Sequence, residues 1–335
     1  ANPDYRTRPI RHSTTIRPIR HSTTIVNNIY SGLIIKAQSG FFTVHCEAGR
    51  FECRIRGQLN HKRLDTDLAT IGDKVIIDVL EDGTGIIKEV CERDSVLARR
   101  LPSSSSENKP RYKDHEIQQV LIANVDQAIF VFSCQDPTPN FRMLDRFLVI
   151  AAANDIPAII CANKVDLIGT DKAVSIFGLY HDIGYQIVYT STFDKQGMQK
   201  LKRLLPGKVS VLAGPSGVGK STLLNTLNPS LGLRVNSISQ SNSKGRHTTV
   251  YPQLIPINDQ GWVADTPGLR ALDFFDIEPE ELDAYFVEIA PLVAECTFSN
   301  CTHTHEPNCA VTSALNKGEV SESRYNSFLQ MRQRN

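Results

Sequence analysis

The sequence has no apolar run long enough to cross a membrane and no large excess of charge of either sign. Its longest apolar run, FLVIAAA at 147–153, falls far short of the roughly 18 residues that a spanning helix needs. The formal net charge is only +1 over 335 residues, so any contact with nucleic acid has to come from local basic patches. We therefore expect a soluble protein that is not a polycation.

The sequence also lacks the regular cysteine spacing of a disulfide-stabilised protein. Five of its eight cysteines stand singly in apolar or strand-like segments, and three are packed between Cys296 and Cys309. This pattern favours a reducing compartment with one metal site over a disulfide framework. The length is sufficient for roughly two or three domains, each with a core of its own.

Residues 1–28 contain a tandem repeat and few acidic residues. The peptide RPIRHSTTI occurs at 8–16 and again at 17–25, in a segment rich in Arg, Ser and Thr. Such a composition predicts a disordered tail, because it cannot bury a core. It is also typical of organelle transit peptides, which points to the plastid stroma or a mitochondrion. The alternatives are the bacterial cytoplasm and an artificial flexible tail.

Residues 29–100 contain five short β-prone runs separated by Gly or Asp-Gly turns: SGLIIKA, FFTVHCE, FECRIRG, KVIIDVLE and GIIKEVCE. Five strands in about seventy residues predict a small closed β-barrel of the oligonucleotide-binding type, an OB-fold. Its basic residues allow two interpretations, a solvated face or an RNA-binding surface. They are Arg50, Arg54, Arg56, Lys62, Arg63, Arg99 and Arg100. Residues 101–112 are rich in serine and are interpreted as a polar linker.

Residues 113–290 alternate between apolar strand-like runs and segments of helical spacing. The strand-like runs are DQAIFVFS, PAIICANKVD, YQIVYTST, KVSVLAGPSG and WVADTPG, whereas FRMLDRFLVIAAAND has helical spacing. This alternation predicts a doubly wound α/β domain with a mostly parallel sheet. Because ligands of such sheets bind at the carboxyl ends of the strands, the polar motifs at those ends form the candidate site.

The motif GPSGVGKST follows the run VSVLA and precedes the helical segment STLLNTL. This context is that of a phosphate-binding P-loop, in which glycines let backbone N–H groups surround the β-phosphate. Lys220 brings a positive charge to the β- and γ-phosphates, and Ser221 can bind Mg²⁺. The predicted nucleotide-binding residues of the loop are Gly214, Pro215, Ser216, Gly217, Val218, Gly219, Lys220, Ser221 and Thr222.

A second motif, NKVD, supplies Asn163, Lys164 and Asp166 at the end of an earlier strand. A carboxylate there can accept hydrogen bonds from both N1–H and the exocyclic amine of guanine, so we expect Asp166 to select GTP over ATP. Asn and Asp are also ordinary turn residues, and the P-loop elsewhere in the sequence is what favours guanine recognition. Ser191 and Thr192, in YTSTFD, are expected to contact the base. The guanine motif thus precedes the P-loop, the reverse of the usual order.

Two further motifs complete a site for GTP hydrolysis. DTPG ends a strand, so Asp265 is expected in the Mg²⁺ shell and the amide of Gly268 at the γ-phosphate. GRHTT at 245–249 offers Thr248 or Thr249 to the metal. The predicted Mg²⁺ ligands are Ser221, Asp265 and one of these threonines, of which Thr249 is preferred.

Leu269 stands where Ras-like GTPases carry the glutamine that orients the attacking water. A leucine side chain cannot orient water, so intrinsic hydrolysis is expected to be slow. Either His247, beside the two threonines, or a group supplied by a partner must then assist.

The segment CTFSNCTHTHEPNC gathers cysteines and histidines close to the carboxyl end. It predicts a closed tetrahedral zinc site, for which His305 competes with His303 as the fourth ligand. The predicted ligands are Cys296, Cys301, His303 and Cys309. Closed sites are usually structural, so one zinc ion is expected to fold a mainly helical domain at 291–335.

The last segment, SRYNSFLQMRQRN, has the spacing of an amphipathic helix. The residues at helical spacing are Tyr325, Phe328, Leu329 and Arg332. We expect the helix to pack on the rest of the protein while presenting Arg324, Arg332 and Arg334 to solvent or to a partner.

The order NKVD, GPSGVGKST, GRHTT, DTPG, preceded by a β-barrel and followed by C-x4-C-x-H-x5-C, resembles the circularly permuted GTPases that depend on the small ribosomal subunit, the RsgA, YjeQ or EngC type. The resemblance runs from Ile29 onward and includes the apolar Leu269. It implies GTP hydrolysis stimulated by the small subunit, a late role in maturing that subunit, and contacts of the barrel and zinc domain with ribosomal RNA. It also implies Mg²⁺ with GTP, one structural zinc, and a monomer without a membrane.

Two other functions are weighed against this one. The first is a GTP-gated RNA-binding placeholder, for which occupancy of the subunit matters and turnover is incidental. The second is an ATP-using P-loop protein, which Asp166 argues against. The motif order also suggests that the γ-phosphate motif at Gly268 leads directly into the zinc domain, so that a switch there could reorient that domain.

Overall fold

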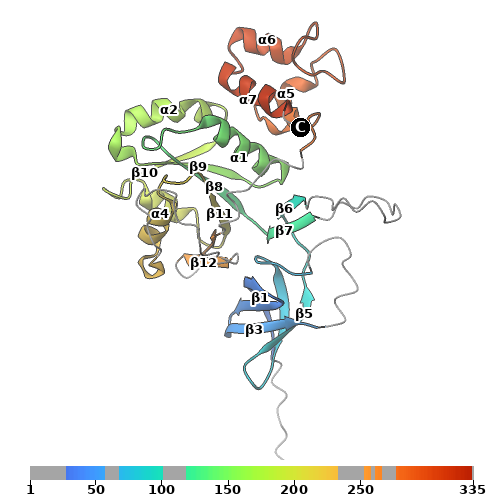
Figure 1. Ribbon diagram of the computed structural model, residues 1–335, viewed down its shortest axis with the longest axis vertical. Coiled ribbons are helices and arrows are strands. Elements are labelled where there is room, and N and C mark those ends of the chain that lie inside the picture. The colour runs from blue at the N-terminus through green and yellow to red at the C-terminus, as the bar shows by residue number, and fades with distance from the viewer. Residues whose placement is uncertain are drawn as a thin grey trace, which may run out of the picture.

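The computed structural model describes residues 28–56, 68–100, 118–232, 253–257, 261–265 and 277–333. For residues 99, 100, 118, 119 and 265 only the backbone is described. The predicted tail at 1–28, apart from its last residue, and the linker at 101–112 lie outside these ranges, as do the motif GRHTT and the last three residues of DTPG. Figure 1 shows three parts along the long axis: a barrel, a central α/β domain and a helical carboxyl-terminal domain.

The amino-terminal domain is the predicted five-stranded barrel. Its strands are β1 (Ile29–Gln38), β2 (Phe41–Cys46), β3 (Gly49–Ile55), β4 (Lys74–Val79) and β5 (Gly85–Val90). Neighbouring strands pair in the order β1-β2-β3-β5-β4, and β4 pairs back to β1, so the sheet closes. All pairs are antiparallel except the parallel pair β3–β5. Side chains that alternate along the strands, such as Ile34, Val44 and Ile77, are fully buried inside.

The central domain, called the G domain below, contains the predicted doubly wound sheet. Its strands are β8 (Gln127–Ser133), β9 (Ala158–Asn163), β10 (Gln186–Thr190), β11 (Val209–Ala213), β12 (Gln253–Ile257) and β13 (Gly261–Asp265). Their order is β10-β9-β8-β11-β13-β12, and only β12 runs antiparallel to its neighbour within the domain. The carboxyl ends of the other five strands therefore meet at one edge of the sheet.

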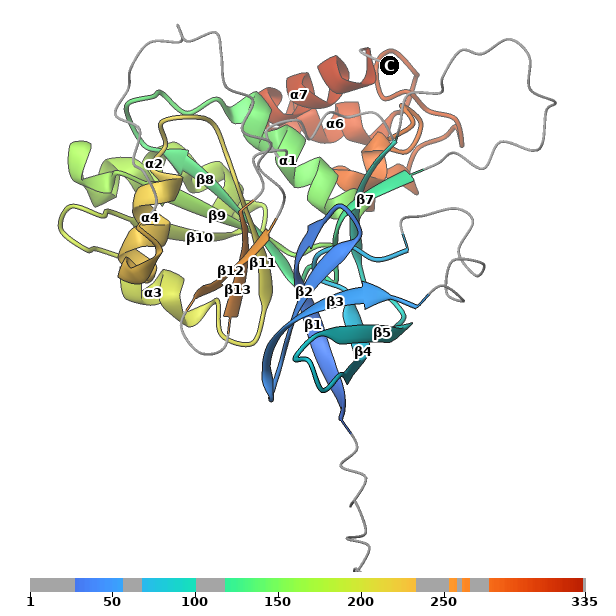
Figure 2. The ribbon, with the colours of Figure 1, turned by 60° about the horizontal axis from the view of Figure 1, so that its bottom comes forward.

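Helices cover both faces of this sheet. They are α1 (Phe141–Ala153), α2 (Thr170–Asp182), α3 (Met198–Arg203) and α4 (Lys220–Leu227), with short 3-10 turns at η2 (Val165–Leu167) and η3 (Pro229–Leu231). Phe130 and Phe132 of β8 belong to the same buried cluster as residues of α1 and α2, whereas Ile129 and Val131 cluster with residues of α3 and α4. This is the alternation of a strand that is buried on both faces. Figure 2 shows α3 and α4 on the side opposite to α1.

The barrel and the G domain share one continuous sheet. Strand β12 pairs with β1 at Lys36 and Gln253, which gives eleven strands in all. Strands β6 (Val96–Arg100) and β7 (Gln118–Ala123) form a separate antiparallel pair between the two domains. The predicted barrel domain ended at residue 100, but β6 pairs with β7 and not with a barrel strand.

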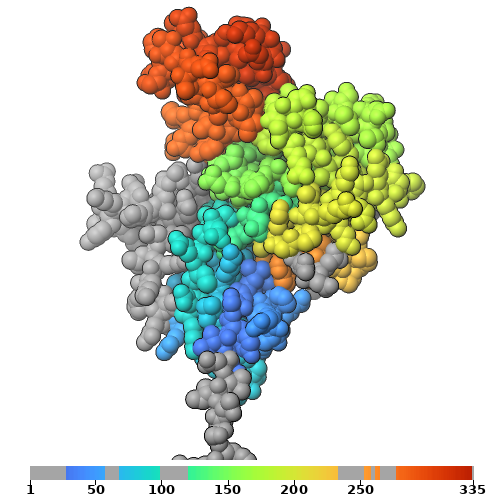
Figure 3. All heavy atoms as spheres, turned by 180° about the vertical axis from the view of Figure 1, so that it is seen from behind, coloured from blue at the N-terminus to red at the C-terminus, as the bar shows by residue number. Residues whose placement is uncertain are grey.

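The carboxyl-terminal domain consists of short helices packed on α1. They are η6 (Leu282–Tyr285), α5 (Ala290–Val293), α6 (Ala310–Lys317) and α7 (Glu322–Arg332). Their buried cluster includes Phe286 and Phe328, whose rings meet edge to face, and it also includes Val149 of α1. Figure 3 shows this domain seated on the G domain at the end away from the barrel. Within the described ranges, no helix has the length and apolar character to cross a membrane.

Candidate functional site

The P-loop connects the end of β11 to the first residue of α4. Two of its glycines have left-handed backbone conformations in tight surroundings, with φ of 150° at Gly214 and 98° at Gly219. A Cβ atom on Gly214 would lie 2.1 Å from the carbonyl oxygen of Val131, and one on Gly219 would lie 2.5 Å from the side-chain nitrogen of Asn163. The close approach of the loop to β8 and β9 therefore requires glycine at both positions.

Lys220 lies at the start of α4 with its ammonium group over the loop. Its Nζ donates hydrogen bonds to the carbonyl oxygens of Gly214, at 2.7 Å, and Pro215, at 2.5 Å. Ser216 and Gly217 are exposed at the outer part of the loop, and Ser221 and Thr222 lie in the first turn of α4. The amino-terminal end of α4, with the positive end of its helix dipole, adjoins the loop, which is the arrangement that binds phosphate.

Asn163 ties the guanine motif to the P-loop from a buried position. Its side-chain nitrogen donates to the carbonyl oxygen of Val218 at 2.8 Å. Its side-chain oxygen accepts a hydrogen bond from the hydroxyl of Thr190 at 3.0 Å. Only 1% of Asn163 is exposed, so its side chain braces the loop and the adjacent strand β10. Val218, one of the predicted loop residues, is buried as well.

Lys164 and Asp166 follow β9 at the same edge of the sheet. Lys164 has a left-handed backbone, with φ of 62°, and its Nζ donates to the carbonyl oxygen of Asp136. Asp166 lies in η2 and is exposed, so its carboxylate is accessible to a base. Thr190 of β10 is in register with Asn163 of β9, and this places Ser191 and Thr192 beside the motif. Ser191 is buried, and its hydroxyl accepts from backbone N–H groups of its own loop.

The predicted hydrolytic residues are only partly described. Asp265 is the last residue of β13, and β13 pairs with β11 at Ala264 and Val211, so its backbone lies beside the strand that leads into the P-loop. Its side chain is not described. The other predicted residues of this group, His247, Thr248, Thr249, Gly268 and Leu269, all lie outside the described residues.

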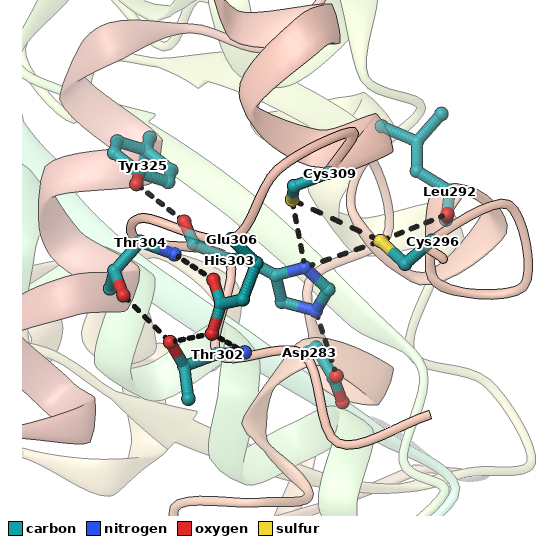
Figure 4. Close-up of polar contacts among 9 residues, drawn as sticks. All are labelled: Asp283, Leu292, Cys296, Thr302, His303, Thr304, Glu306, Cys309 and Tyr325. Carbon is teal, nitrogen blue, oxygen red and sulfur yellow. Dashed lines mark hydrogen bonds and ion pairs between the residues drawn. The ribbon is translucent and has the colours of Figure 1, made fainter. Parts of the chain in front are cut away.

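The predicted metal ligands lie together in the carboxyl-terminal domain. The ligand atoms of Cys296, Cys301, His303 and Cys309 all lie within 4.8 Å of one another. Nδ1 of His303 faces the sulfur atoms of Cys309, at 3.4 Å, and Cys296, at 3.6 Å, as Figure 4 shows. His305 is exposed, and its Nδ1 pairs with the hydroxyl of Thr304. The fold therefore brings His303, and not the competing His305, to the three thiols.

Neighbouring residues hold His303 in one orientation. Nε2 of His303 lies 3.2 Å from a carboxylate oxygen of Asp283 in η6. The Tyr325 hydroxyl donates to the backbone oxygen of His303 at 2.6 Å (Figure 4). A carboxylate on one imidazole nitrogen leaves the other nitrogen free to bind a metal, a pairing common at zinc histidines. Three thiols and one oriented imidazole fit a closed zinc site.

The loop between the ligands is held by Glu306. Its carboxylate accepts hydrogen bonds from the backbone N–H groups of Thr302 at 2.8 Å and Thr304 at 3.0 Å, and from the Thr302 hydroxyl (Figure 4). The thiol environments differ. Burial raises the pKa of Cys301 to about 12, whereas around Cys309 hydrogen bonds from the Thr312 N–H and from His303 outweigh burial and lower the pKa to about 7.

Comparison with known proteins agrees with this geometry. The model of the family described as RsgA GTPase matches residues 91–275, and that of the RsgA N-terminal domain matches residues 31–87. This chain belongs to the RsgA GTPase family. The Small ribosomal subunit biogenesis GTPase RsgA of Alkaliphilus metalliredigens is 39% identical over 302 residues, which cover 90% of this chain and 96% of that protein. Its counterpart from Halalkalibacterium halodurans is 40% identical over 301 residues, covering 89% and 94%.

Two solved structures of similar proteins support the same architecture. YjeQ from Thermotoga maritima has a TM-score of 0.73 and 35% identity, covering 91% of this chain and 98% of that one. YloQ, described as a circularly permuted GTPase, has a TM-score of 0.70 and 33% identity, covering 94% and 97%. The predicted permuted order is confirmed in this chain, because β9 and β10 with the guanine motif precede β11 and the P-loop.

One surface prediction for the carboxyl-terminal helix α7 is wrong. Arg324 was expected at the surface, but its side chain is 1% exposed. It donates to Asp145 of α1 at 2.7 Å and forms two hydrogen bonds with Glu288, at 2.6 and 3.0 Å. The Tyr180 hydroxyl of α2 also donates to Asp145, at 2.7 Å. We call Asp145, Tyr180, Glu288 and Arg324 the latch network; it joins the carboxyl-terminal domain to α1 and α2.

Sequence reasoning missed Asp283, Glu306 and the latch network. Asp283 lies in an acidic stretch with no motif around it, 20 residues before the histidine that it contacts. Glu306 was visible only as part of the HEPN turn. Asp145 is the one acidic residue in the otherwise apolar and basic segment FRMLDRFLVIAAA, and that contrast is the signal that could have drawn attention to it.

Proposed function

We propose that this RsgA-family GTPase acts in the late maturation of the small ribosomal subunit, binding the subunit and hydrolysing GTP to GDP and phosphate with stimulation by it. The proposal rests above all on one observation. A glycine-constrained P-loop and a guanine motif are braced against each other through Asn163 at one sheet edge, in a chain whose relatives are named small ribosomal subunit biogenesis GTPases.

In this proposal each described residue of the edge has a separate task. Asp166 accepts hydrogen bonds from the guanine base, with Ser191 and Thr192 beside it. Lys220 turns from the loop carbonyls to the β- and γ-phosphates, which it neutralises, together with the N–H groups of the P-loop. Ser221, Asp265 and Thr249 would hold Mg²⁺, which supplies positive charge to the phosphate oxygens when bound. Asn163 keeps the two motifs in register.

Hydrolysis itself breaks the bond between the γ-phosphorus and the β–γ bridging oxygen, as a water oxygen bonds to phosphorus and gives up its proton. Leu269 cannot orient that water, so we assign the stimulation to a catalytic group that acts when the subunit is bound, supplied by the subunit or, within the chain, by His247.

The barrel is the proposed ribosomal RNA contact of the amino-terminal half. Arg50, Arg54 and Arg56 are exposed, and the guanidinium of Arg54 lies 4.4 Å from the ring centroid of Phe41. A guanidinium stacked on an exposed ring presents both a charge for phosphate and a flat surface for a base. If this face binds RNA, affinity falls steeply as salt rises, whereas a salt-independent affinity would contradict the proposal.

We infer that the Cys3His cluster binds one structural zinc ion, and that the protein works as a monomer. Because these similar proteins come from bacteria, we expect the partner to be a small ribosomal subunit of the bacterial type. For the same reason we expect the protein to lie in a bacterial cytoplasm. The plastid stroma depends on residues 1–28 alone; targeting of a fluorescent fusion of those residues would test it.

The deciding experiment is single-turnover hydrolysis of GTP with and without purified small subunits. Strong stimulation supports the proposal, whereas tight binding to the subunit with no stimulation would favour a placeholder whose occupancy is its function. Competition between GTP and ATP tests the base preference. Equal affinities would exclude the role of Asp166, and Asp166→Ala should abolish the preference for GTP.

A further inference from the structure

A cavity of about 440 Å³ lies where the barrel meets the G domain. Its volume is within the roughly 300–1,000 Å³ of sites that bind small ligands. Both domains line it, with residues 31–33, Lys74, residues 94–95, residues 124–126, residues 207–209 and Trp262. On the G-domain side these residues lie at the amino ends of β8, β11 and β13, whereas the P-loop and the guanine motif follow carboxyl ends. The cavity is therefore a site separate from the nucleotide edge.

Hydrogen bonds between the two domains hold the walls of this cavity. The Asn124 side chain accepts from the Asp94 N–H and donates to the Gly72 carbonyl oxygen of the barrel, both at 2.8 Å. The Asp126 carboxylate accepts from the Val209 N–H at 2.7 Å. Strand β1 also pairs with β12, which places the barrel beside the G-domain sheet (Figure 2). Because these bonds join protein groups to one another, the fold itself fixes the walls.

Trp262, near the start of β13, is the aromatic residue of the cavity wall. Its indole is half-buried and contacts the imidazole of His45 in β2, with ring centroids 5.1 Å apart and planes at 64°. Since His45 belongs to the barrel, both domains fix the orientation of the indole. An indole that lines a cavity provides a flat apolar surface on which any nucleobase can stack.

The charges of the cavity wall are balanced. Lys74 and Lys208 are matched by Asp94 and Asp126, and Nζ of Lys74 lies 2.7 Å from the Asp94 carboxylate. Nζ of Lys208 donates to the uncharged Oε1 of Gln127 at 3.0 Å. Because the wall carries no net charge, it suits an uncharged base better than a phosphate group.

A basic segment leads from α3 to the cavity. Residues 200–208 contain no acidic residue, and their four basic residues, all exposed, are Lys200, Lys202, Arg203 and Lys208. None of the salt bridges between described residues involves any of the four. Exposed cations that follow one another along a surface are typical of contacts with a phosphate backbone.

We propose that an unpaired nucleotide of a single-stranded RNA segment inserts its base into this cavity and stacks on Trp262. Lys208 and the basic residues of α3 bind the neighbouring phosphates. A free nucleotide would fill the cavity alone, whereas the cations of α3 lie outside it and are engaged only by a longer strand. This contact is additional to the proposed RNA-binding face of the barrel and does not depend on it.

Trp262 is the only tryptophan of the chain, so its emission reports on the cavity directly. The full-length protein, saturated with GDP to fill the nucleotide site, is titrated with an adenosine hexaribonucleotide. Stacking should quench the emission up to a plateau, whereas an abasic hexamer with the same phosphates should not quench it. Unchanged emission at concentrations where the anisotropy of a labelled hexamer shows saturation would overturn the proposal, as would equal quenching by the abasic hexamer.

Variants separate the base from the phosphates. Trp262→Ala should weaken the hexamer by about 5- to 150-fold, and Trp262→Phe should restore most of the affinity. Lys208→Ala leaves β13 intact and should lower the slope of log affinity against log salt by about 0.7, the value for one phosphate contact of a single strand. Lys172→Ala, at an exposed position of α2, is the matched control and should change neither the affinity nor the slope.

A folded Trp262→Ala chain that binds the hexamer within twofold of the wild type would contradict the stacking. If Trp262→Ala does not fold, the Lys208→Ala slope decides, and a wild-type slope overturns the proposal. Adenosine monophosphate should quench Trp262 only at much higher concentrations than the hexamer. Quenching at equal concentrations would mean that the cavity takes a free nucleotide, which overturns the RNA contact.

Two further outcomes separate this contact from the function proposed above. Arg54→Ala, on the barrel face, should weaken the hexamer without changing the quenching at saturation. If Arg54→Ala abolishes binding and the wild-type Trp262 emission never changes, the barrel face holds and the cavity proposal alone is overturned. Quenching by the hexamer together with no stimulation of GTP hydrolysis by small subunits would overturn the proposed function and support the cavity contact.

Discussion

The nucleotide edge of the G domain and the Cys3His cluster of the carboxyl-terminal domain differ in the exposure of their functional side chains and in the contacts that the rest of the protein makes with them. At the nucleotide edge Asp166 and Ser216 are exposed. In the cluster, His303 is buried and contacted on both sides, by two thiols and by Asp283. The exposed site is suited to a ligand that binds reversibly, and the buried cluster is suited to a permanently bound ion.

The largest expected effect of breaking this contrast comes from removing the zinc ion that we propose for the cluster. Structural zinc sites contribute on the order of 10 kcal/mol of apparent binding free energy, which small domains use to fold. Chelation, or Cys309→Ser, should therefore unfold the carboxyl-terminal domain and leave the barrel folded. Limited proteolysis and metal analysis would follow this, with one zinc ion per wild-type chain.

Cys91→Ser is the matched control for that experiment, because Cys91 is only partly buried and lies outside the cluster. It should keep one zinc ion and the wild-type proteolysis pattern. A Cys309→Ser chain that still bound a full equivalent of zinc would show that the four residues are not the ligands.

The second effect concerns the latch network, which joins the two regions through α1 and α2. Arg324→Ala leaves Asp145 and Glu288 buried without a counter-charge, and such a change costs about 3–5 kcal/mol. Denaturant unfolding of the variant should show this loss. Lys317→Ala, at an exposed position of α6, should stay within about 0.5 kcal/mol of the wild type.

The latch network also constrains how nucleotide binding could reorient the carboxyl-terminal domain. Burial raises the pKa of Tyr180, and the nearby Asp145 carboxylate raises it further, so the phenol keeps the proton that it donates to Asp145. Because Asp145 of α1 accepts hydrogen bonds from both Arg324 of α7 and Tyr180 of α2, we expect the carboxyl-terminal domain to move together with α1 and α2. Spin-label distances from α7 to α2 should be equal with GDP and with a GTP analogue; a change would show that the network opens.

The sequence predicted those features that depend on residues close to one another along the chain. Parallel strands bring their carboxyl ends to one edge, so motifs such as the P-loop and NKVD could be placed side by side without coordinates. The Cys3His spacing was equally local, although it left His303 and His305 as alternatives. The fold decided between them by burying one and exposing the other.

Features that depend on distant residues could not be predicted. Helical spacing predicted that α7 is amphipathic, but the partners of Arg324 lie 36 and 179 residues away in sequence. The sequence around an arginine does not show whether it is buried, because the carboxylates that pair with it come from distant segments. The predicted barrel domain ran to residue 100, whereas residues 96–100 form β6, whose partner β7 lies beyond the serine-rich linker.

The third effect is on the nucleotide edge. Lys220→Ala removes the charged donor of the P-loop, and charge-assisted hydrogen bonds are worth about 1.5–3 kcal/mol each. Affinity for GTP should fall by about 100-fold, while the far-ultraviolet circular dichroism stays the same. Calorimetry measures the affinity for GTP. Lys200→Ala, at an exposed position of α3, is the control and should bind GTP normally, whereas GTP turnover retained in Lys220→Ala would show that the loop is misassigned.

The smallest expected effect comes from changing Asp283, which lies outside the cysteine and histidine motif. Asp283 bonds the imidazole nitrogen opposite the thiols, and loss of such a carboxylate typically lowers metal affinity by about 10- to 100-fold. Asp283→Ala should therefore release zinc to a chromogenic chelator at a lower chelator concentration than the wild type does. Glu280→Gln, an exposed acid just before η6, controls for the loss of a nearby charge and should behave as the wild type. Equal zinc affinity in Asp283→Ala would mean that the three thiols and the backbone around His303, which Tyr325 and Glu306 anchor, orient the imidazole without the carboxylate.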